Sequence, residues 1–170
     1  MKKMTLIMMV VVFSFVGVNS LFAANYVGVK RCKMCHRKEY KSWKTTKMAQ
    51  AFELLKPGVK AEEKKAAGLD GAKDYTTDAT CLGCHTTNGK ADMPGVQCEA
   101  CHGPGSGYMK VMMTNRDFKL ADLQAKGFIL PDATTCKKCH NKKSPFYKTF
   151  DFATFKAKGT HQHYKLRKAH

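Results

Sequence analysis

Short apolar stretches, spaced as in amphipathic helices, alternate with polar ones along this chain. Residues 39–55 are predicted to form a helix, because apolar side chains recur there near helical spacing. These positions are Tyr40, Trp43, Met48, Phe52 and Leu55. The dipeptide Pro57-Gly58 follows as a stop signal. A helix at this place would cover one face of a cofactor or core.

Three further segments complete the helical pattern. Residues 60–67, KAEEKKAA, have helical composition, and turn-forming residues continue to position 80, so 60–80 is predicted to be a solvated connection. Residues 117–126, before Pro131, and residues 150–158 are the other predicted helices. The fold class is therefore mainly α, with little regular secondary structure.

The N-terminus has the three parts of an export signal. Lys2 and Lys3 precede an apolar run over residues 6–18, and small residues follow at Ala23-Ala24. Cleavage near Ala23 divides the chain into a signal peptide, 1–23, and one domain, 24–170. An uncleaved membrane anchor is the alternative, but the run falls short of the roughly 20 apolar residues that span a bilayer. The mature chain is expected in the periplasm or outside the cell, without a transmembrane anchor.

All eight cysteines lie in four copies of Cys-x-x-Cys-His. The copies, here called motifs 1 to 4, are Cys32-Lys-Met-Cys35-His36, Cys81-Leu-Gly-Cys84-His85, Cys98-Glu-Ala-Cys101-His102 and Cys136-Lys-Lys-Cys139-His140. Disulfides and zinc are alternatives for paired cysteines in an exported protein. Neither explains a histidine after every pair, whereas covalent c-type haem attachment requires it.

The motif spacing suits haem chemistry. Two thiols one helical turn apart can each form a thioether to a haem vinyl group, and the adjacent imidazole then reaches the iron. His36, His85, His102 and His140 are the predicted proximal ligands. Four haems on a chain of this length must form much of the apolar core, with helices and loops wrapped around them.

The net charge is strongly positive even without the signal peptide, with 28 Lys and Arg against 13 Asp and Glu. Eight haem propionates would reduce the excess to about +7. The remaining charge favours redox partners with acidic docking surfaces. A role in binding nucleic acid is not expected of an exported haem protein.

The connections around motifs 2 and 3 are short. Twelve residues join His85 to Cys98, with turn signals at Asn88-Gly89 and Pro94-Gly95, which predicts that haems 2 and 3 lie close together. Gly103-Pro104-Gly105 is predicted to be a turn that passes close to a porphyrin.

Beyond the haem motifs, the stretches KSWKTTKMAQAFELLKP, AKDYTTDATCLGCH, GVQCEACHGPG and HQHYKL occur in an order that resembles the cytochrome c-554 family of tetrahaem carriers. The resemblance covers nearly all of residues 24–170. It implies haems in closely stacked pairs and periplasmic electron transport from a multihaem oxidoreductase toward other cytochromes. It also implies an open iron position on haem 2 and histidine pairs on the other three haems.

The resemblance further implies distal ligands. His163 matches the distal histidine of haem 1, with His161 as the fallback. Met48 stands where the family has the histidine of haem 3, and Met112 stands where it has that of haem 4, with Met109 and Met113 as competitors. Apolar packing is the alternative for these methionines. Methionine ligation would raise the potentials of haems 3 and 4.

The number of histidines supports methionine in place of histidine as a distal ligand, because only His161, His163 and His170 remain beyond the four proximal histidines. The leading hypothesis is an electron carrier that exchanges electrons with other multihaem redox proteins. Reduction of a small nitrogen oxide, such as nitric oxide, at an open haem 2 is the alternative. A third possibility is end-to-end assembly into haem-lined filaments, for which the sequence offers no support.

Overall fold

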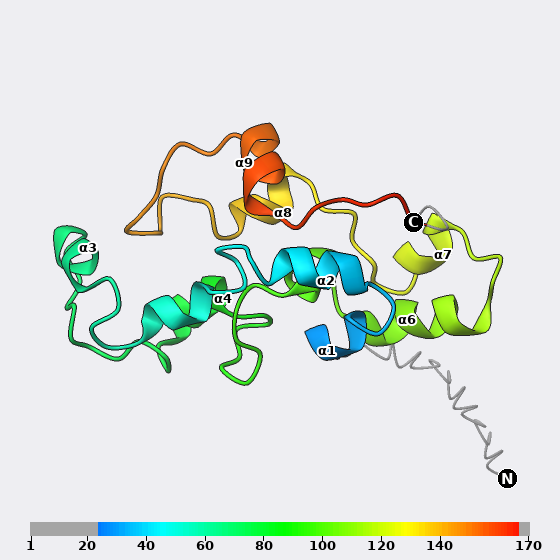
Figure 1. Cartoon of the computed structure of the whole chain (residues 1–170), viewed down its shortest axis with the longest axis horizontal. Coiled ribbons are helices and arrows are strands. Elements are labelled where there is room, and N and C mark those ends of the chain that lie inside the picture. The colour runs from blue at the N-terminus through cyan, green and yellow to red at the C-terminus, as the bar shows by residue number, and fades with distance from the viewer. Residues whose placement is uncertain (1–23, 167–170) are drawn as a thin grey trace, which may run out of the picture.

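The computed structural model describes residues 24–166 and is built from short helices joined by loops (Figure 1). The predicted signal peptide and His170 lie outside these residues. The elements are α1 Val29–Cys32, α2 Arg37–Trp43, the 3-10 helix η1 Ala51–Leu55, α3 Ala61–Ala66, α4 Ala79–His85, α5 Cys98–His102, α6 Gly105–Thr114, α7 Leu120–Gln124, α8 Ala133–Lys137 and α9 Phe152–Gly159. Within residues 24–166, β-pairing is limited to an isolated bridge between Thr86 and Pro94. The mainly α prediction is confirmed.

The helices are spread along one long axis, with α3 near one end and α7 near the other (Figure 1). Two small hydrophobic clusters lie along this axis. One joins α6 to α7 through Tyr108, Phe118, Leu123 and Phe128. The other joins η1 to α4 through Leu55, Tyr75 and Leu82. The polypeptide is thus organised around two separate clusters rather than one large core.

The helix predicted over residues 39–55 is interrupted. The α2 helix ends at Trp43, and residues 44–50 form turns before η1 begins at Ala51. The Thr45 and Thr46 hydroxyls donate to the carbonyls of Ser42 and Trp43 at 2.8 and 2.7 Å. Such local bonds compete with helix continuation, which apolar spacing alone does not reveal.

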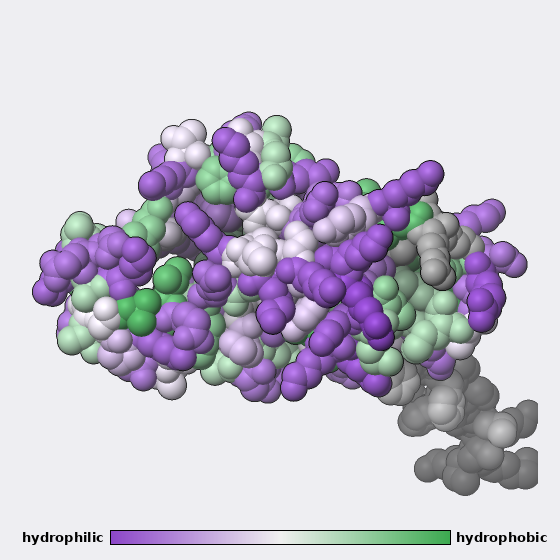
Figure 2. Space-filling model, viewed as in Figure 1, coloured by the Kyte–Doolittle hydropathy of each residue, from purple (hydrophilic) through white to green (hydrophobic). Residues whose placement is uncertain are grey.

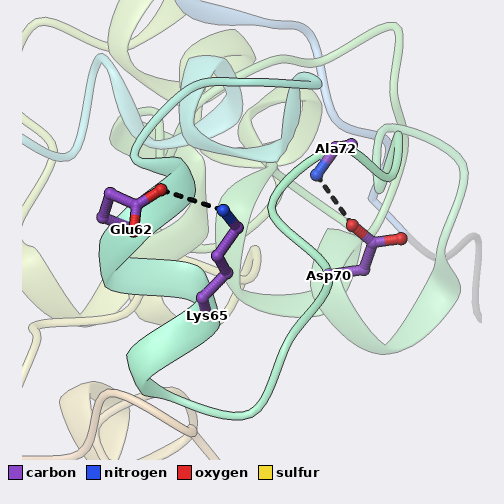
Figure 3. Close-up of polar contacts among 4 residues, drawn as sticks. All are labelled: Glu62, Lys65, Asp70 and Ala72. Carbon is purple, nitrogen blue, oxygen red and sulfur yellow. Dashed lines mark hydrogen bonds and ion pairs between the residues drawn. The ribbon is translucent and has the colours of Figure 1, made fainter.

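The connection over residues 60–80 is only partly solvated. The α3 helix confirms the predicted helical segment, and its outer face carries exposed i,i+3 ion pairs such as Lys65 to Glu62 at 3.0 Å (Figure 3). Lys64, however, is only 4% exposed, and its Nζ donates to the carbonyl of Lys56 at 2.8 Å. The prediction of a solvated connection is wrong for this inner face, which packs on Tyr75.

The later helices agree with the sequence in part. Residues 152–159 are helical within two residues of the predicted 150–158, and residues 120–124 are helical inside the predicted 117–126, with the start three residues later. The longest helix, α6, was not predicted, because its start, GSGYM, contains two glycines, which are poor helix formers. Gly103, with φ of 78°, supplies the predicted turn just before it.

The start of α6 is held by a buried carboxylate. Glu99 is 1% exposed, and its two oxygens accept four hydrogen bonds of 2.6–3.1 Å from the backbone N–H groups of Val27, Gly28 and Gly105. These donors belong to the segment before α1 and to the first residue of α6. One side chain therefore ties three segments together.

Replacement of Glu99 by glutamine should destabilise the fold by about 2 kcal/mol, because an amide has one acceptor oxygen and its NH₂ would face backbone N–H groups. Guanidinium unfolding of the mature protein, followed by far-ultraviolet circular dichroism, measures the change. The exposed Glu53→Gln is the matched control, with an expected change below about 0.5 kcal/mol. Equal stabilities of the two variants would contradict the stabilising role of the Glu99 hydrogen bonds.

Candidate haem-binding site

The four Cys-x-x-Cys-His motifs share one backbone geometry. Motifs 2 and 3 lie on the helices α4 and α5. Motifs 1 and 4 begin at the ends of α1 and α8 and continue as a turn. In those two, the N–H of the histidine donates to the carbonyl of the first cysteine at 3.0 Å, as in a helix. Both thiols and the imidazole of each motif are thus held within one helical turn.

Aspartates cap the helices of motifs 2 and 4. The Asp78 carboxylate accepts from the backbone N–H of Thr80 and Cys81, and Asp132 accepts from that of Thr135. The bonds from Cys81 and Thr135 are the main reason why the pKa values of the two aspartates lie below the usual range. Each cap fixes the direction in which its motif helix begins.

Two proximal histidines are oriented through Nδ1. His85 Nδ1 lies 2.6 Å from the carbonyl oxygen of Ala51, and His102 Nδ1 lies 3.2 Å from that of Ile129. A carbonyl only accepts, so Nδ1 carries the proton in this arrangement and Nε2 has a free lone pair. Metal-bound histidines are held in this way in proteins.

The motifs approach one another through their thiols. The Cys98 thiol of motif 3 is close enough to Cys32 of motif 1 to raise the pKa of Cys32, and the Cys139 thiol of motif 4 donates to the carbonyl of Gly83 in motif 2 at 3.8 Å. Burial raises the pKa of Cys101 to about 11, and the Cys136 thiol of motif 4 adds to the rise. Motifs 1 and 3, 3 and 4, and 4 and 2 are therefore neighbours in space.

The link between motifs 2 and 3 is a closed loop. Asn88 and Gly89 both have positive φ, at 59° and 65°, which confirms the predicted turn. The buried Thr87 hydroxyl donates to the carbonyl of Gly95 and accepts from the N–H of Gln97. The link thus brings its own two ends together, whereas the thiol contacts pair motif 2 with motif 4.

The C-terminal tail brings two histidines to motifs 1 and 3. The ring centre of His161 lies 6.3 Å from that of His102 and 4.7 Å from that of His163. The N–H of Gln162, between them, donates to Ser42 Oγ of α2 at 2.8 Å. Local sequence could not reveal this approach, because 120 residues separate Gln162 from Ser42.

Three histidines, His102, His140 and His163, have lowered pKa values. Burial lowers the pKa of His102 to about 4, helped by the neighbouring His161, His163 and His36. Burial also lowers the pKa values of His163 and His140. A neutral imidazole is the form that binds a metal.

Two cavities adjoin the histidines. One, of about 540 Å³, lies between α2, α9 and the tail and is lined by Ser42, Ala153, Lys156, Ala157, Thr160, His161, Gln162 and His163. A smaller one, of about 160 Å³, is lined by residues around His140, including Phe146 and Phe155. Phe150 stacks on the His140 ring at 5.2 Å. The first cavity has the size of a cofactor site.

The residues fit c-type haem. Each motif offers two thiols and an imidazole within a helical turn, and in two motifs the Nδ1 contact leaves Nε2 free. The eight cysteines form no disulfide. Within residues 24–166, no group of three or more Cys, His, Asp or Glu side chains could by itself hold a metal ion.

The methionines named as distal ligands lie apart from each other. Met112 and Met109 pack against the cluster of Tyr108, Phe118, Leu123 and Phe128, so apolar contact accounts for part of their burial. Met113 is 69% exposed. Met48 is half-buried, and its carbonyl accepts from the N–H of Val96, just before motif 3.

No helix within residues 24–166 is long and apolar enough to cross a membrane.

Comparison with known proteins links the chain to cytochromes. Residues 31–103 match the family model described as cytochrome c554 and c-prime. The chain is 33% identical to cytochrome c-554 of Nitrosomonas europaea over 194 residues, which cover 91% of this chain and 83% of that protein.

A solved structure is also similar, with the reduced state of cytochrome c554 from Nitrosomonas europaea superposing at a TM-score of 0.72 and 34% identity. The match covers 85% of this chain and 88% of that one.

The aspartate caps predict a specific acid response. Because the folded pKa values of Asp78 and Asp132 are lowered, their stabilisation is complete above the unfolded value of about 3.9 and is lost as pH falls through the folded values. The double variant Asp78→Asn/Asp132→Asn keeps the caps without this titration. Its melting temperature should match the parent's at about pH 7 and fall less between about pH 5 and pH 2. Parallel pH profiles would contradict this account.

Proposed function

Because the chain belongs to the cytochrome c-554 family, whose members are c-type cytochromes with covalent haem, we propose that it is a periplasmic tetrahaem electron carrier between multihaem redox proteins. The domain is residues 24–170, and residues 1–23 direct export. In each of the four motifs, the two cysteines together attach one haem. Bound haem supplies one reversible electron per iron.

The contact pattern of the motif thiols carries this proposal. The Cys98 thiol of motif 3 raises the pKa of Cys32 in motif 1, the Cys139 thiol of motif 4 donates to the carbonyl of Gly83 in motif 2, and the Cys136 thiol of motif 4 raises the pKa of Cys101 in motif 3. The attachment points therefore form one continuous series in the order 1, 3, 4, 2. A series without a break suits electron transport along the molecule better than four independent sites.

The chain's own residues hold and orient this series. His36, His85, His102 and His140 present the proximal imidazoles, and the carbonyls of Ala51 and Ile129 fix the proton of His85 and His102 on Nδ1. Glu99 connects the segment before motif 1 to motif 3. The arrangement is preorganised, so little of the polypeptide has to move.

The geometry favours His161 as the second ligand opposite His102. The ring centres of His102 and His161 lie 6.3 Å apart, so both imidazoles would be available to the haem iron that motif 3 would hold. His161 competes in this role with Met48, which stays the ligand that the resemblance predicts for haem 3, and Met112 stays the ligand predicted for haem 4. His163, which is close enough to His102 to lower its pKa, remains the predicted ligand of haem 1.

Replacement of His161 by alanine should convert one low-spin ferric haem to high spin, seen by electron paramagnetic resonance and near-infrared magnetic circular dichroism. Met48→Ala should leave the haem of motif 3 unchanged. His163→Ala is the matched tail variant, and it should alter a different haem. Loss of the same low-spin signal in Met48→Ala, with an intact signal in His161→Ala, would restore Met48 to this position.

The carrier function predicts that the mature protein contains four haems and takes up four electrons per chain, one for each motif. Mass spectrometry and a coulometric titration measure these quantities, and Cys81→Ala/Cys84→Ala should lower both to three. The reduced protein should pass electrons rapidly to another multihaem cytochrome. Slow exchange together with catalytic consumption of nitric oxide would instead support the nitrogen-oxide reductase alternative.

A further inference from the structure

The basic charge of the chain is concentrated around motif 1. Residues 30–47 carry eight basic side chains against the single acidic residue Glu39. The eight are Lys30, Arg31, Lys33, Arg37, Lys38, Lys41, Lys44 and Lys47, and all are exposed. Motif 2 and its surroundings, residues 76–97, carry Lys90 against Asp78 and Asp92. Of motifs 1 and 2, only motif 1 is therefore surrounded by excess positive charge.

This charge is not neutralised within the described part of the chain. None of the eight basic side chains forms an ion pair within residues 24–166, where the lysine ion pairs are those of Lys56, Lys60 and Lys65. Lys33 instead lies over the Tyr40 ring at 5.1 Å, and Lys38 over the Tyr164 ring at 5.8 Å. In the space-filling view, hydrophilic side chains gather over α2 (Figure 2).

An apolar side chain lies among these charges. Met34 is 64% exposed and stands between the two cysteines of motif 1. Cys35, next to it, is exposed, whereas the other seven cysteines are half-buried. The haem attachment point of motif 1 is therefore closer to solvent than those of motifs 2, 3 and 4.

We propose that residues 30–47, with Met34 at their centre, form the docking surface for a redox protein that presents a carboxylate-rich face. The inference rests on the proposed carrier function and locates its partner site at motif 1. Interfaces combine an apolar centre with a polar rim, and opposite charges raise the association rate by steering the encounter. An exposed methionine is also able to adapt to a partner surface.

A second basic segment offers a matched control. Residues 133–150 carry five lysines and no acidic residue, and Phe146 is exposed there. Both cysteines of motif 4 are half-buried, however. Lys142 and Lys143 are as exposed as Lys30 and Lys41, so charge reversal of either pair changes the net charge equally.

The experiment measures binding of oxidised flavodoxin, a small acidic redox protein, to the mature holoprotein by calorimetry, without electron transfer. Lys30→Glu/Lys41→Glu should weaken binding about 10-fold at low ionic strength. The difference should disappear near 1 M salt, where the Debye length is about 3 Å. Lys142→Glu/Lys143→Glu should change binding less than about 2-fold, and Met34→Ser should weaken it at every salt concentration.

Equal effects of the two charge reversals, or a larger effect of the motif 4 pair, would overturn the proposal, as would unchanged binding in both. The rate of electron transfer from reduced flavodoxin is the second readout, and each transfer oxidises the flavin by one electron and reduces one iron by one. Full reduction of the haems by dithionite tests the carrier function separately from the docking surface. If dithionite reduces the haems but the Lys30 and Lys41 variants bind flavodoxin as tightly as the parent does, the docking proposal is wrong and the carrier function stands.

Discussion

The fold depends on the burial of one carboxylate between the first and third haem motifs. Glu99 accepts four backbone hydrogen bonds, from Val27, Gly28 and Gly105. A buried carboxylate is tolerable only when its lone pairs are satisfied, so the segments that supply these donors must assemble around it. The assembly fixes α1, which ends at Cys32, relative to α5, which begins at Cys98, and it starts α6 despite the glycines at its N-terminus.

The tail completes this arrangement from the other end of the sequence. The N–H of Gln162 donates to Ser42 Oγ of α2, and the ring of the neighbouring His161 lies 6.3 Å from that of His102. The site of motifs 1 and 3 therefore draws on three distant parts of the chain. Ordering them costs conformational entropy that the two small side-chain clusters offset only in part, and covalent haem would supply the remaining apolar contacts.

Sequence patterns predicted the features that depend on local chemistry. The four motifs, the turn at Asn88-Gly89, and the helices at 61–66 and 152–159 follow from composition and spacing over a few residues. The break after Trp43 was not predictable from apolar spacing, because it depends on the hydroxyls of Thr45 and Thr46 and on the bond from Trp43 Nε1 to Val96. The pairing of His102 with His161 depends on contacts between distant segments. The spacing within a motif predicts which residues attach a haem, but not which haems are neighbours.

The order of the motifs in space and the distribution of charge have a joint consequence. Motifs 1 and 2 stand at opposite ends of the series 1, 3, 4, 2, and their surroundings differ in charge. The eight lysine and arginine side chains of residues 30–47 are exposed and form no ion pair within residues 24–166, whereas the region beside motif 2 contains the ion pairs of Lys56, Lys60 and Lys65. Exposed ion pairs add little stability, but they cancel the local field. A carrier must accept electrons from one protein and deliver them to another, and two ends with different electrostatic character let it distinguish the two partners.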